Sequence, residues 1–333
     1  MVNNGDAVRK TSGEALYPPI TPYREDWLDV GQGHRIRFEE SGNPRGIPVV
    51  FLHGGPGSGT NSNQRRFFDP EGYRVVLLDQ RGAGRSTPAG ETRANTTAHL
   101  VADLERLRSA LGVAGWLLFG GSWGATLALA YGIAHPPRVR GMILRGVFLG
   151  SRREVSWYTG GLRAFVPEAW ARFFEASGAR APPGILDGYR RQLRASQPAT
   201  RLAAAAAWRD YESTLMALQE DAPPDLPPPD DALVARVRVQ LHYLAHDCFL
   251  APGALLRGAR RLRGIAARIV QGRFDLVCPP LAAQRLQAAW PRTELHLVEG
   301  AGHGAFDPRI APALVAAADR FRDLLAPDLV QRP

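Results

Sequence analysis

The sequence contains one serine whose neighbours suit it to act as a nucleophile. Gly120, Gly121 and Gly124 surround Ser122 in the pattern G-x-S-x-G. Glycines at these positions permit the sharp turn between a strand and a helix that lifts a serine hydroxyl above the edge of a sheet. An apolar run precedes Ser122 and an alanine-rich run follows it. A chance match in a glycine-rich chain would lack this context, so we interpret Ser122 as the nucleophile of an acyl-transfer reaction.

A serine hydroxyl needs a general base, and histidine is the side chain best suited to that role near neutral pH. In a site of this kind the chain order is serine, acid, histidine. Among the histidines that follow Ser122 are His242, His246, His296 and His303. His303 lies in a glycine-rich loop after the last strand-like run, whereas the others lie in a strand-like run or in the helical middle. Asp275 follows the preceding strand-like run and fits as the acid that orients His303; capping the next helix is its alternative role.

Two glycine-rich loops precede the nucleophile. His53-Gly54-Gly55-Pro56-Gly57 ends the first buried strand-like run. We expect the N–H groups of Gly55 and Trp123 to form an oxyanion hole, Gly54 to contact the substrate, and His53 to be structural. The second loop, residues 79–86, matches neither phosphate-binding pattern, G-x-x-x-x-G-K-[ST] or G-x-G-x-x-G, which argues against nucleotide binding.

These residues can meet only if the strands that carry them are parallel and end at one edge. Strand-like runs and helix-like runs alternate on both sides of the middle of the chain. The strand-like runs are 47–52, 73–78, 116–119, 142–147, 269–271 and 294–298; the helix-like runs are 95–111, 125–134, 280–290 and 310–325. This alternation is typical of an α/β fold with a mostly parallel central sheet, whose sites lie at the carboxyl ends of the strands.

The middle of the chain has a different pattern. From 151 to 257 the strand signal disappears, and Ala, Arg, Trp and Tyr recur at helical spacing. We interpret 1–150 and 258–333 as two parts of one core and 151–257 as an inserted helical cap. The proline-rich run Pro223–Pro229 within it predicts a stiff loop; a ligand for a proline-binding module is the alternative.

Composition narrows the function classes. The net charge is +9, but the positive charge is nearly all arginine and is scattered among acidic residues, which argues against nucleic-acid binding. No apolar run of about 18 residues predicts a membrane helix, and the start of the chain lacks the apolar core of a secretory signal. Cys248 and Cys278 are too few for a disulfide framework and form no C-x-x-C pair. We expect reduced thiols, a cytoplasmic location, and no metal or other cofactor.

The motifs taken together resemble those of prolyl aminopeptidase, also called proline iminopeptidase. The segments that carry the resemblance are HGGPG at 53–57, DQRGAGRS at 79–86, GGSWG at 120–124, GRFDLVCP at 272–279 and GAGHGAF at 300–306. The resemblance extends from about Tyr17 to Ala326. It implies an α/β-hydrolase fold with an inserted helical cap, no metal, and removal of an N-terminal proline from peptides.

The resemblance also implies a substrate pocket in the cap. In that family, acidic side chains hold the substrate ammonium and aromatic side chains enclose the proline ring. Glu212, in the segment Trp208–Glu212, is then an ammonium ligand, and Phe148 and Tyr158 are aromatic pocket residues, with ordinary core packing as their alternative. The second acid of the family is replaced by Gln240, which can still accept a hydrogen bond but carries no charge. Leu244 replaces a further aromatic residue.

Three functions are therefore weighed. The first is an exopeptidase or aminoacyl amidase that uses Ser122, His303 and Asp275 on a small peptide. The second is an esterase, thioesterase or specialised amide hydrolase that keeps these residues but has an altered cap pocket at Gln240 and Leu244. The third is a non-catalytic binding protein on the same fold, against which the complete set of catalytic residues argues. We expect no nucleic-acid or membrane partner.

Overall fold

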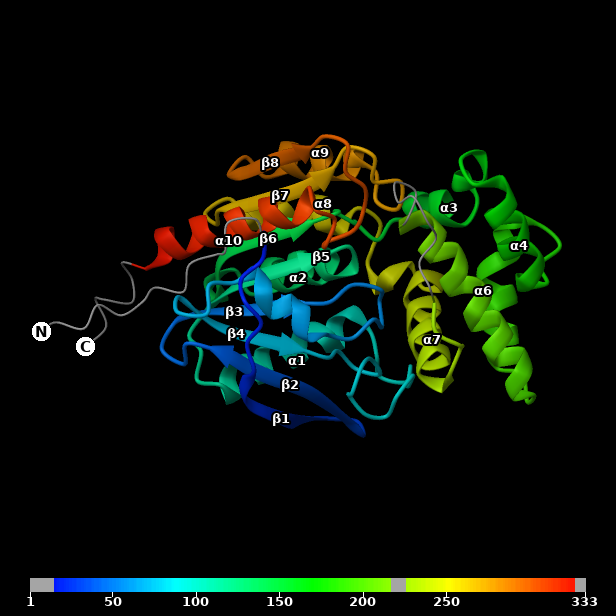
Figure 1. Ribbon diagram of the computed structural model, residues 1–333, viewed down its shortest axis with the longest axis horizontal. Helices are drawn as coiled ribbons and strands as arrows, with labels where there is room; N and C mark the ends of the chain where they lie inside the picture. Colours follow the sequence, from blue (N-terminus) through cyan, green and yellow to red (C-terminus); the bar gives the residue numbers. More distant parts are fainter. Residues whose placement is uncertain (1–14, 217–225, 327–333) are drawn as a thin grey trace, which may run out of the picture.

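The computed structural model describes residues 15–216 and 226–326. Its strands form one eight-stranded sheet within these residues, in the order β1-β2-β4-β3-β5-β6-β7-β8 (Figure 1). The strands are β1 (Pro22–Gly31), β2 (His34–Gly42), β3 (Ile47–Leu52), β4 (Tyr73–Leu78), β5 (Trp116–Gly121), β6 (Val139–Arg145), β7 (Ala267–Gly272) and β8 (Thr293–Val298). β2 pairs antiparallel with β1 and β4, and every pairing from β4 to β8 is parallel. The predicted α/β fold with a mostly parallel sheet is confirmed.

The antiparallel pair β1 and β2 was not among the predicted strands. β2 is buried almost throughout although it carries Arg37, Glu39 and Glu40. Arg37 is paired with Glu39 at 2.5 Å and with Glu25 on β1 at 2.8 Å. Buried charges are tolerated when they are paired in this way. Because the charges interrupt the hydrophobic pattern, the sequence does not read as a buried strand.

Alternate residues along the central strands face two separate cores, as strand geometry requires. Val50 and Leu52 of β3 belong to the core under helices α1 (Thr97–Ala110), α2 (Trp123–Ala134) and α9 (Pro280–Ala289). Val49 and Phe51 face the opposite core, which α10 (Ile310–Leu325) covers. α2 begins two residues before the predicted helix, so that Ser122 lies at its first turn.

A group of helices lies beside the sheet and forms the cap (Figure 1). Its helices include α3 (Arg152–Thr159), α4 (Pro167–Ser177), α5 (Ile185–Gln192), α6 (Pro198–Met216) and α7 (Asp231–Ala245). α8 (Ala254–Gly258) packs against α2 and α9 of the core. The first three residues of the proline-rich run, 223–225, lie outside the described residues, and 226–229 lead irregularly into α7. The division of the chain at 151 and 257 stays a prediction.

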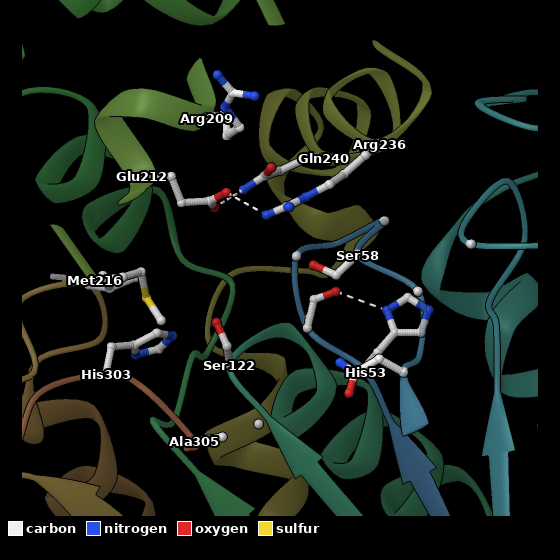
Figure 2. A pocket seen from close by; sticks show the side chains of 18 of the residues that line it. His53, Ser58, Ser122, Arg209, Glu212, Met216, Arg236, Gln240, His303 and Ala305 are labelled. Atoms are coloured by element: carbon white, nitrogen blue, oxygen red, sulfur yellow. Dashed lines mark hydrogen bonds and ion pairs between the residues drawn. The ribbon is translucent and has the colours of Figure 1, made fainter. Parts of the chain in front are cut away.

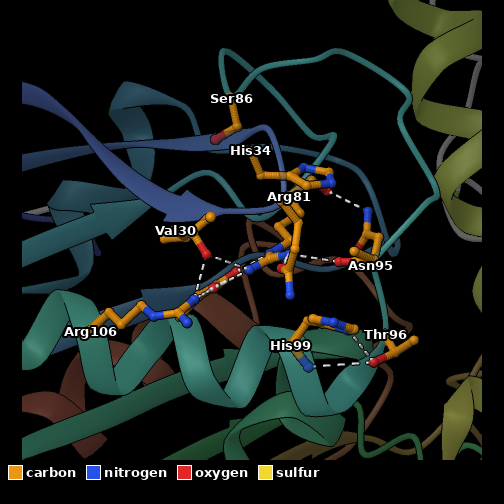
Figure 3. A network of polar contacts seen from close by, with 12 residues as sticks. Val30, His34, Arg81, Ser86, Asn95, Thr96, His99 and Arg106 are labelled. Carbon is orange, nitrogen blue, oxygen red and sulfur yellow. Dashed lines mark hydrogen bonds and ion pairs between the residues drawn. The ribbon is translucent and has the colours of Figure 1, made fainter.

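A buried polar network joins the loop after β4 to α1 (Figure 3). Asn95 connects the same network to the cap. Arg81 donates to both carboxylate oxygens of Asp103, at 2.6 and 2.7 Å. Asn95 donates to the carbonyl of Arg81 at 3.0 Å and accepts from the hydroxyl of Tyr243 on α7 at 2.7 Å. Thr96 caps α1. Asn95 therefore acts as the link between core and cap.

Among the described residues, no helix combines the length and the apolar character that a membrane span needs.

Candidate active site

Ser122 lies at the turn between β5 and α2, in a conformation that few residues other than glycine adopt. Its φ is 57° and its ψ is −121°. The turn is tight because a Cβ atom at Gly124 would lie 2.0 Å from the carbonyl oxygen of Leu52, and one at Gly120 would lie 2.3 Å from the carbonyl oxygen of Gly124. The N–H of Ser122 is held by the carbonyl of Arg145 on β6 at 2.8 Å. This over-determined backbone presents the Ser122 hydroxyl at the strand end.

Asp275 and His303, which were predicted as acid and base, lie together. His303 Nδ1 is 2.8 Å from Asp275 Oδ2, and both side chains are buried. Asp275 also accepts from the N–H of Cys278 at 2.7 Å and from Gln271 Nε2 at 3.1 Å. These donors hold the carboxylate so that it accepts from Nδ1–H, which leaves Nε2 as the basic nitrogen. Figure 2 shows His303 and Ser122 in the same pocket.

Arg145 is a site residue that the sequence reasoning missed. Its Nε atom is buried, and Nη1 lies 3.0 Å from His303 Nε2 and donates to the carbonyl of His303 at 2.8 Å. Burial lowers the pKa of Arg145, while Asp275 acts in the opposite direction. Because Nε2 accepts from Arg145 here, Ser122 must replace that contact when it transfers its proton. An arginine at the end of an apolar parallel strand was the available signal.

Cys278 also lies at the nucleophile. Its Sγ atom is 4.0 Å from Ser122 Oγ, and burial raises the pKa of the thiol well above its usual value. The thiol is therefore neutral at the pH at which a serine–histidine pair works. Cys278 and Cys248 are both free, as predicted, and both are buried.

The loop after β3 passes directly beside Ser122. A Cβ atom at Gly54 would lie 3.6 Å from Ser122 Cβ and 3.3 Å from the carbonyl oxygen of Gly121. His53 anchors this loop, because its Nδ1 lies 2.9 Å from the carbonyl oxygen of Gly54 and its Nε2 accepts from the N–H of Gln80 at 3.1 Å. Burial lowers the pKa of His53, which favours the neutral ring that these contacts require. The geometry agrees with a structural role for His53.

Trp123, which with Gly55 was predicted to form the oxyanion hole, is held in place by its side chain. Its indole N–H donates to Gln80 Oε1 at 2.8 Å. Its backbone N–H is at the first position of α2, where a helix offers no partner of its own. The first turn of α2 therefore presents a donor beside Ser122, while Gly55 lies in the adjacent loop with a φ of 110°.

We call the edge of the sheet that carries Ser122, Asp275 and His303 the catalytic edge. A cavity of about 930 Å³ connects it with the cap. Its lining includes all the predicted pocket residues: Gly54, Phe148, Tyr158, Glu212 and Gln240, together with Leu244. Phe148 and Tyr158 remain only 9% and 8% exposed. Tyr158 also packs against the rings of Trp208 and Tyr211, so cavity lining and core packing both apply to it.

The carboxylate of Glu212 is already paired within the protein (Figure 2). Arg236 Nη2 donates to its Oε2 at 2.7 Å, and Gln240 Nε2 donates to its Oε1 at 2.8 Å. Trp208 Nε1 in turn donates to Gln240 Oε1 at 3.1 Å. Gln240 therefore uses its amide as a donor to Glu212 and as an acceptor from Trp208. Arg236 was missed by the sequence reasoning, although it lies one turn before Gln240 on α7 and so shares its face.

Among the described residues, no three His, Cys, Asp or Glu side chains are grouped as a metal site would require.

This combination of a sheet, a nucleophile turn and an acid–histidine pair at the strand ends is that of the alpha/beta hydrolase fold, whose family model matches residues 47–309. A proline iminopeptidase of Xylella fastidiosa (strain 9a5c) is 45% identical over 310 residues, which cover 92% of this chain and 99% of the relative. A proline iminopeptidase of Arabidopsis thaliana is 43% identical over 314 residues, covering 93% and 83%. The chain belongs to the proline iminopeptidase family of serine hydrolases.

A solved structure agrees with the fold. The crystal structure of proline iminopeptidase from Mycobacterium smegmatis superposes with a TM-score of 0.56 at 19% identity, covering 92% of this chain and 98% of that one.

Proposed function

We propose that this protein hydrolyses the amide bond that follows an N-terminal prolyl or related aminoacyl group, with Ser122 as nucleophile, His303 as general base and Asp275 as the orienting acid. The observation that carries the proposal is the contact of His303 Nδ1 with Asp275 at 2.8 Å beside the cavity that Ser122 also lines. The relatives named proline iminopeptidase support the choice of substrate. The reaction needs no metal or other cofactor in this scheme.

The proposed reaction begins when Ser122 Oγ attacks the scissile carbonyl carbon and its proton passes to His303 Nε2. Asp275 then stabilises the imidazolium through Nδ1. The negative charge that develops on the carbonyl oxygen is stabilised by the backbone N–H groups of Gly55 and Trp123. His303 gives its proton to the leaving amine, which departs and leaves an acyl group on Ser122. Water, deprotonated by His303, hydrolyses that acyl-enzyme and restores the hydroxyl.

The cap side of the cavity is proposed to contain the acyl group. Phe148 and Tyr158 supply aromatic surface for a ring, and Gly54 permits close approach next to Ser122. Glu212 and Gln240 are polar groups on the cap side of the same cavity (Figure 2). A small peptide or small amide is the expected substrate, and two free thiols favour the reducing environment of the cytoplasm.

A second candidate function is favoured by one observation. Each carboxylate oxygen of Glu212 already accepts a hydrogen bond, one from Arg236 and one from Gln240, and the charge of Arg236 opposes a substrate ammonium. An esterase or a specialised amide hydrolase with an altered pocket would not require one.

A panel of substrates tests these functions. We would measure kcat/KM for proline p-nitroanilide, alanine p-nitroanilide, an N-blocked proline anilide and a short-chain p-nitrophenyl ester. The Ser122→Ala variant serves as the blank. Preference for prolyl anilides that is lost in Ser122→Ala supports the proposal. Turnover of the ester alone favours the second function, and full turnover by Ser122→Ala would sink the mechanism.

A further inference from the structure

Glu212 occupies the position in the cap pocket where a substrate cation would bind, but a cation of this chain already pairs with it. Arg236 Nη2 lies 2.7 Å from Glu212 Oε2, and the two side chains are 35% and 18% exposed. The ion pair joins α6, which carries Glu212, to α7, which carries Arg236. Figure 2 shows the Arg236 side chain extending toward Glu212 on the cap side of the cavity that contains Ser122. The acid is thus neutralised before any substrate arrives.

Gln240 cannot take the place of the missing acid. Its Oε1 accepts from Trp208 Nε1, and its Nε2 donates to Glu212 Oε1 at 2.8 Å. An indole N–H can only donate and an ionised carboxylate can only accept, so the two partners fix the orientation of the amide. Gln240 is 3% exposed, and both polar atoms of its amide are committed to these two partners. The second oxygen of Glu212 is therefore also engaged.

Within the part of the chain that the structure describes, two polar groups at this end are buried without a hydrogen-bond partner, and both can donate. They are the Tyr158 hydroxyl and Arg236 Nε. Burial raises the pKa of Tyr158 well above its usual value, with Glu212 acting in the same direction, so the hydroxyl keeps its proton. Both residues line the same cavity as Ser122. A ligand group that accepts hydrogen bonds would satisfy donors of this kind.

The charges decide which ligand group suits this end of the cavity. Arg236 and Glu212 cancel, so an ammonium placed here would meet Arg236 without a free carboxylate, and a carboxylate would meet Glu212. Arg209 also lines the cavity, but it is paired with Asp210 at 2.9 Å. An uncharged group with a carbonyl oxygen avoids both repulsions.

We propose that Arg236 is a specificity-determining residue, which closes Glu212 to a substrate ammonium so that this subsite receives the uncharged nitrogen of an N-acylated aminoacyl amide. The inference rests on the proposed amide hydrolysis at Ser122, and it names a substrate class for the second candidate function, a specialised amide hydrolase with an altered pocket. The carbonyl of the N-acyl group is the acceptor for the donors at this end, and the amide bond on the other side of the residue is the one cleaved.

The test compares proline p-nitroanilide with N-acetylproline p-nitroanilide. The quantity measured is the ratio of kcat/KM for the free-amine substrate to kcat/KM for the acetylated one. We expect this ratio to be one or lower in the unaltered protein, and to rise by about tenfold or more in Arg236→Ala, because like charges no longer meet. Adding Gln240→Glu to Arg236→Ala should raise the ratio further. The matched control is Arg209→Ala, which removes a cation from the same cavity but leaves Glu212 paired.

Two results would overturn the proposal. One is a preference of the unaltered protein for the free amine by more than tenfold. The other is a ratio in Arg236→Ala within about twofold of the unaltered value. Arg236→Met, which keeps the apolar stem of the side chain, replaces Arg236→Ala if thermal unfolding shows that the alanine variant is not folded.

A binding measurement separates failure of the proposal from failure of the proposed function. Calorimetry of proline amide and N-acetylproline amide with Ser122→Ala, and with Ser122→Ala combined with Arg236→Ala, needs no turnover. Tighter binding of the acetylated amide, reversed by the second substitution, supports the subsite even if neither anilide is hydrolysed. Tighter binding of proline amide to Ser122→Ala overturns it.

Discussion

The catalytic edge and the cap subsite lie in one cavity but are built in different ways. At the edge, Ser122, Asp275 and His303 each follow a different parallel strand, so the backbone of the sheet sets their positions. In the cap subsite, Glu212 and Arg236 come from two helices that face each other, and a side-chain ion pair sets their arrangement. The reaction therefore depends on residues whose positions the fold fixes, whereas substrate specificity can change when one side chain, such as Arg236, is replaced.

The largest expected effect tests the edge. Asp275→Asn keeps the shape of the side chain but removes the charge that stabilises the imidazolium and fixes its tautomer. We expect kcat for a prolyl anilide to fall by about 10⁴-fold, as in other triads of this kind. KM should change little, because Asp275 does not contact the acyl group. A loss below about tenfold, with the fold intact by circular dichroism, would remove Asp275 from the reaction.

The network between the two regions gives the next largest effect. Asp103 is 3% exposed and pairs with Arg81, whose side chain is fully buried. Asp103→Asn leaves that guanidinium without its counter-charge, so we expect the free energy of unfolding to fall by about 3–5 kcal/mol. Urea unfolding measures the change. Glu294→Gln, at an exposed ion pair, is the control and should cost at most about 1 kcal/mol.

The same experiment asks whether core and cap unfold together. Arg81 is linked through Asn95 to Tyr243 of the cap, so we expect one transition in Asp103→Asn. Two separate transitions would mean that the cap subsite does not depend on the core for its stability.

The catalytic edge could be predicted from the sequence where its signals are local, and could not where its contacts join distant residues. Ser122, Asp275 and His303 were found because glycine turns and strand ends leave a local signal in the sequence. Arg145 was missed because its contact with His303 joins residues 158 positions apart. β2 was missed because its buried charges are satisfied by partners on other strands and loops.

In the cap, the sequence shows which residue occupies each pocket position, but it does not show which side chains form hydrogen bonds or ion pairs with one another. The replacement of an acid by Gln240 is visible in the sequence. Its orientation depends on Trp208, which lies 32 positions away, and the engagement of Glu212 depends on Arg236, 24 positions away. No local pattern specifies which of several arginines reaches a given carboxylate when two helices pack together.

A third variant measures how tightly the backbone controls the edge. Gly146 has a φ of 53°, and a Cβ atom there would lie 2.9 Å from His303 Cε1. Gly146→Ala should therefore displace the imidazole and lower kcat by about 10²-fold, because displacements near 1 Å have effects of that size. Gly112→Ala is the matched control, since Gly112 has a φ of 66° and a Cβ atom there meets nothing within 4 Å. Equal kcat in the two variants would argue that the imidazole has room to adjust.

The smallest expected effect is on the pH dependence of stability, and it compares one buried histidine beside the catalytic edge with one in the cap. Burial lowers the pKa of His53, in the loop beside Ser122, and of His242, on α7, below the usual value of 6.5. As the pH falls below 6.5, these two histidines are protonated in the unfolded chain but stay neutral in the folded protein, so the free energy of unfolding should decrease. Urea unfolding at pH 7.5 and 5.5 measures that loss. His53 is completely buried and His242 only partly, so His53→Gln should remove more of the pH-dependent loss than His242→Gln. If His242→Gln removed more of that loss, the cap and not the catalytic edge would be the main source of the decrease in the free energy of unfolding at low pH.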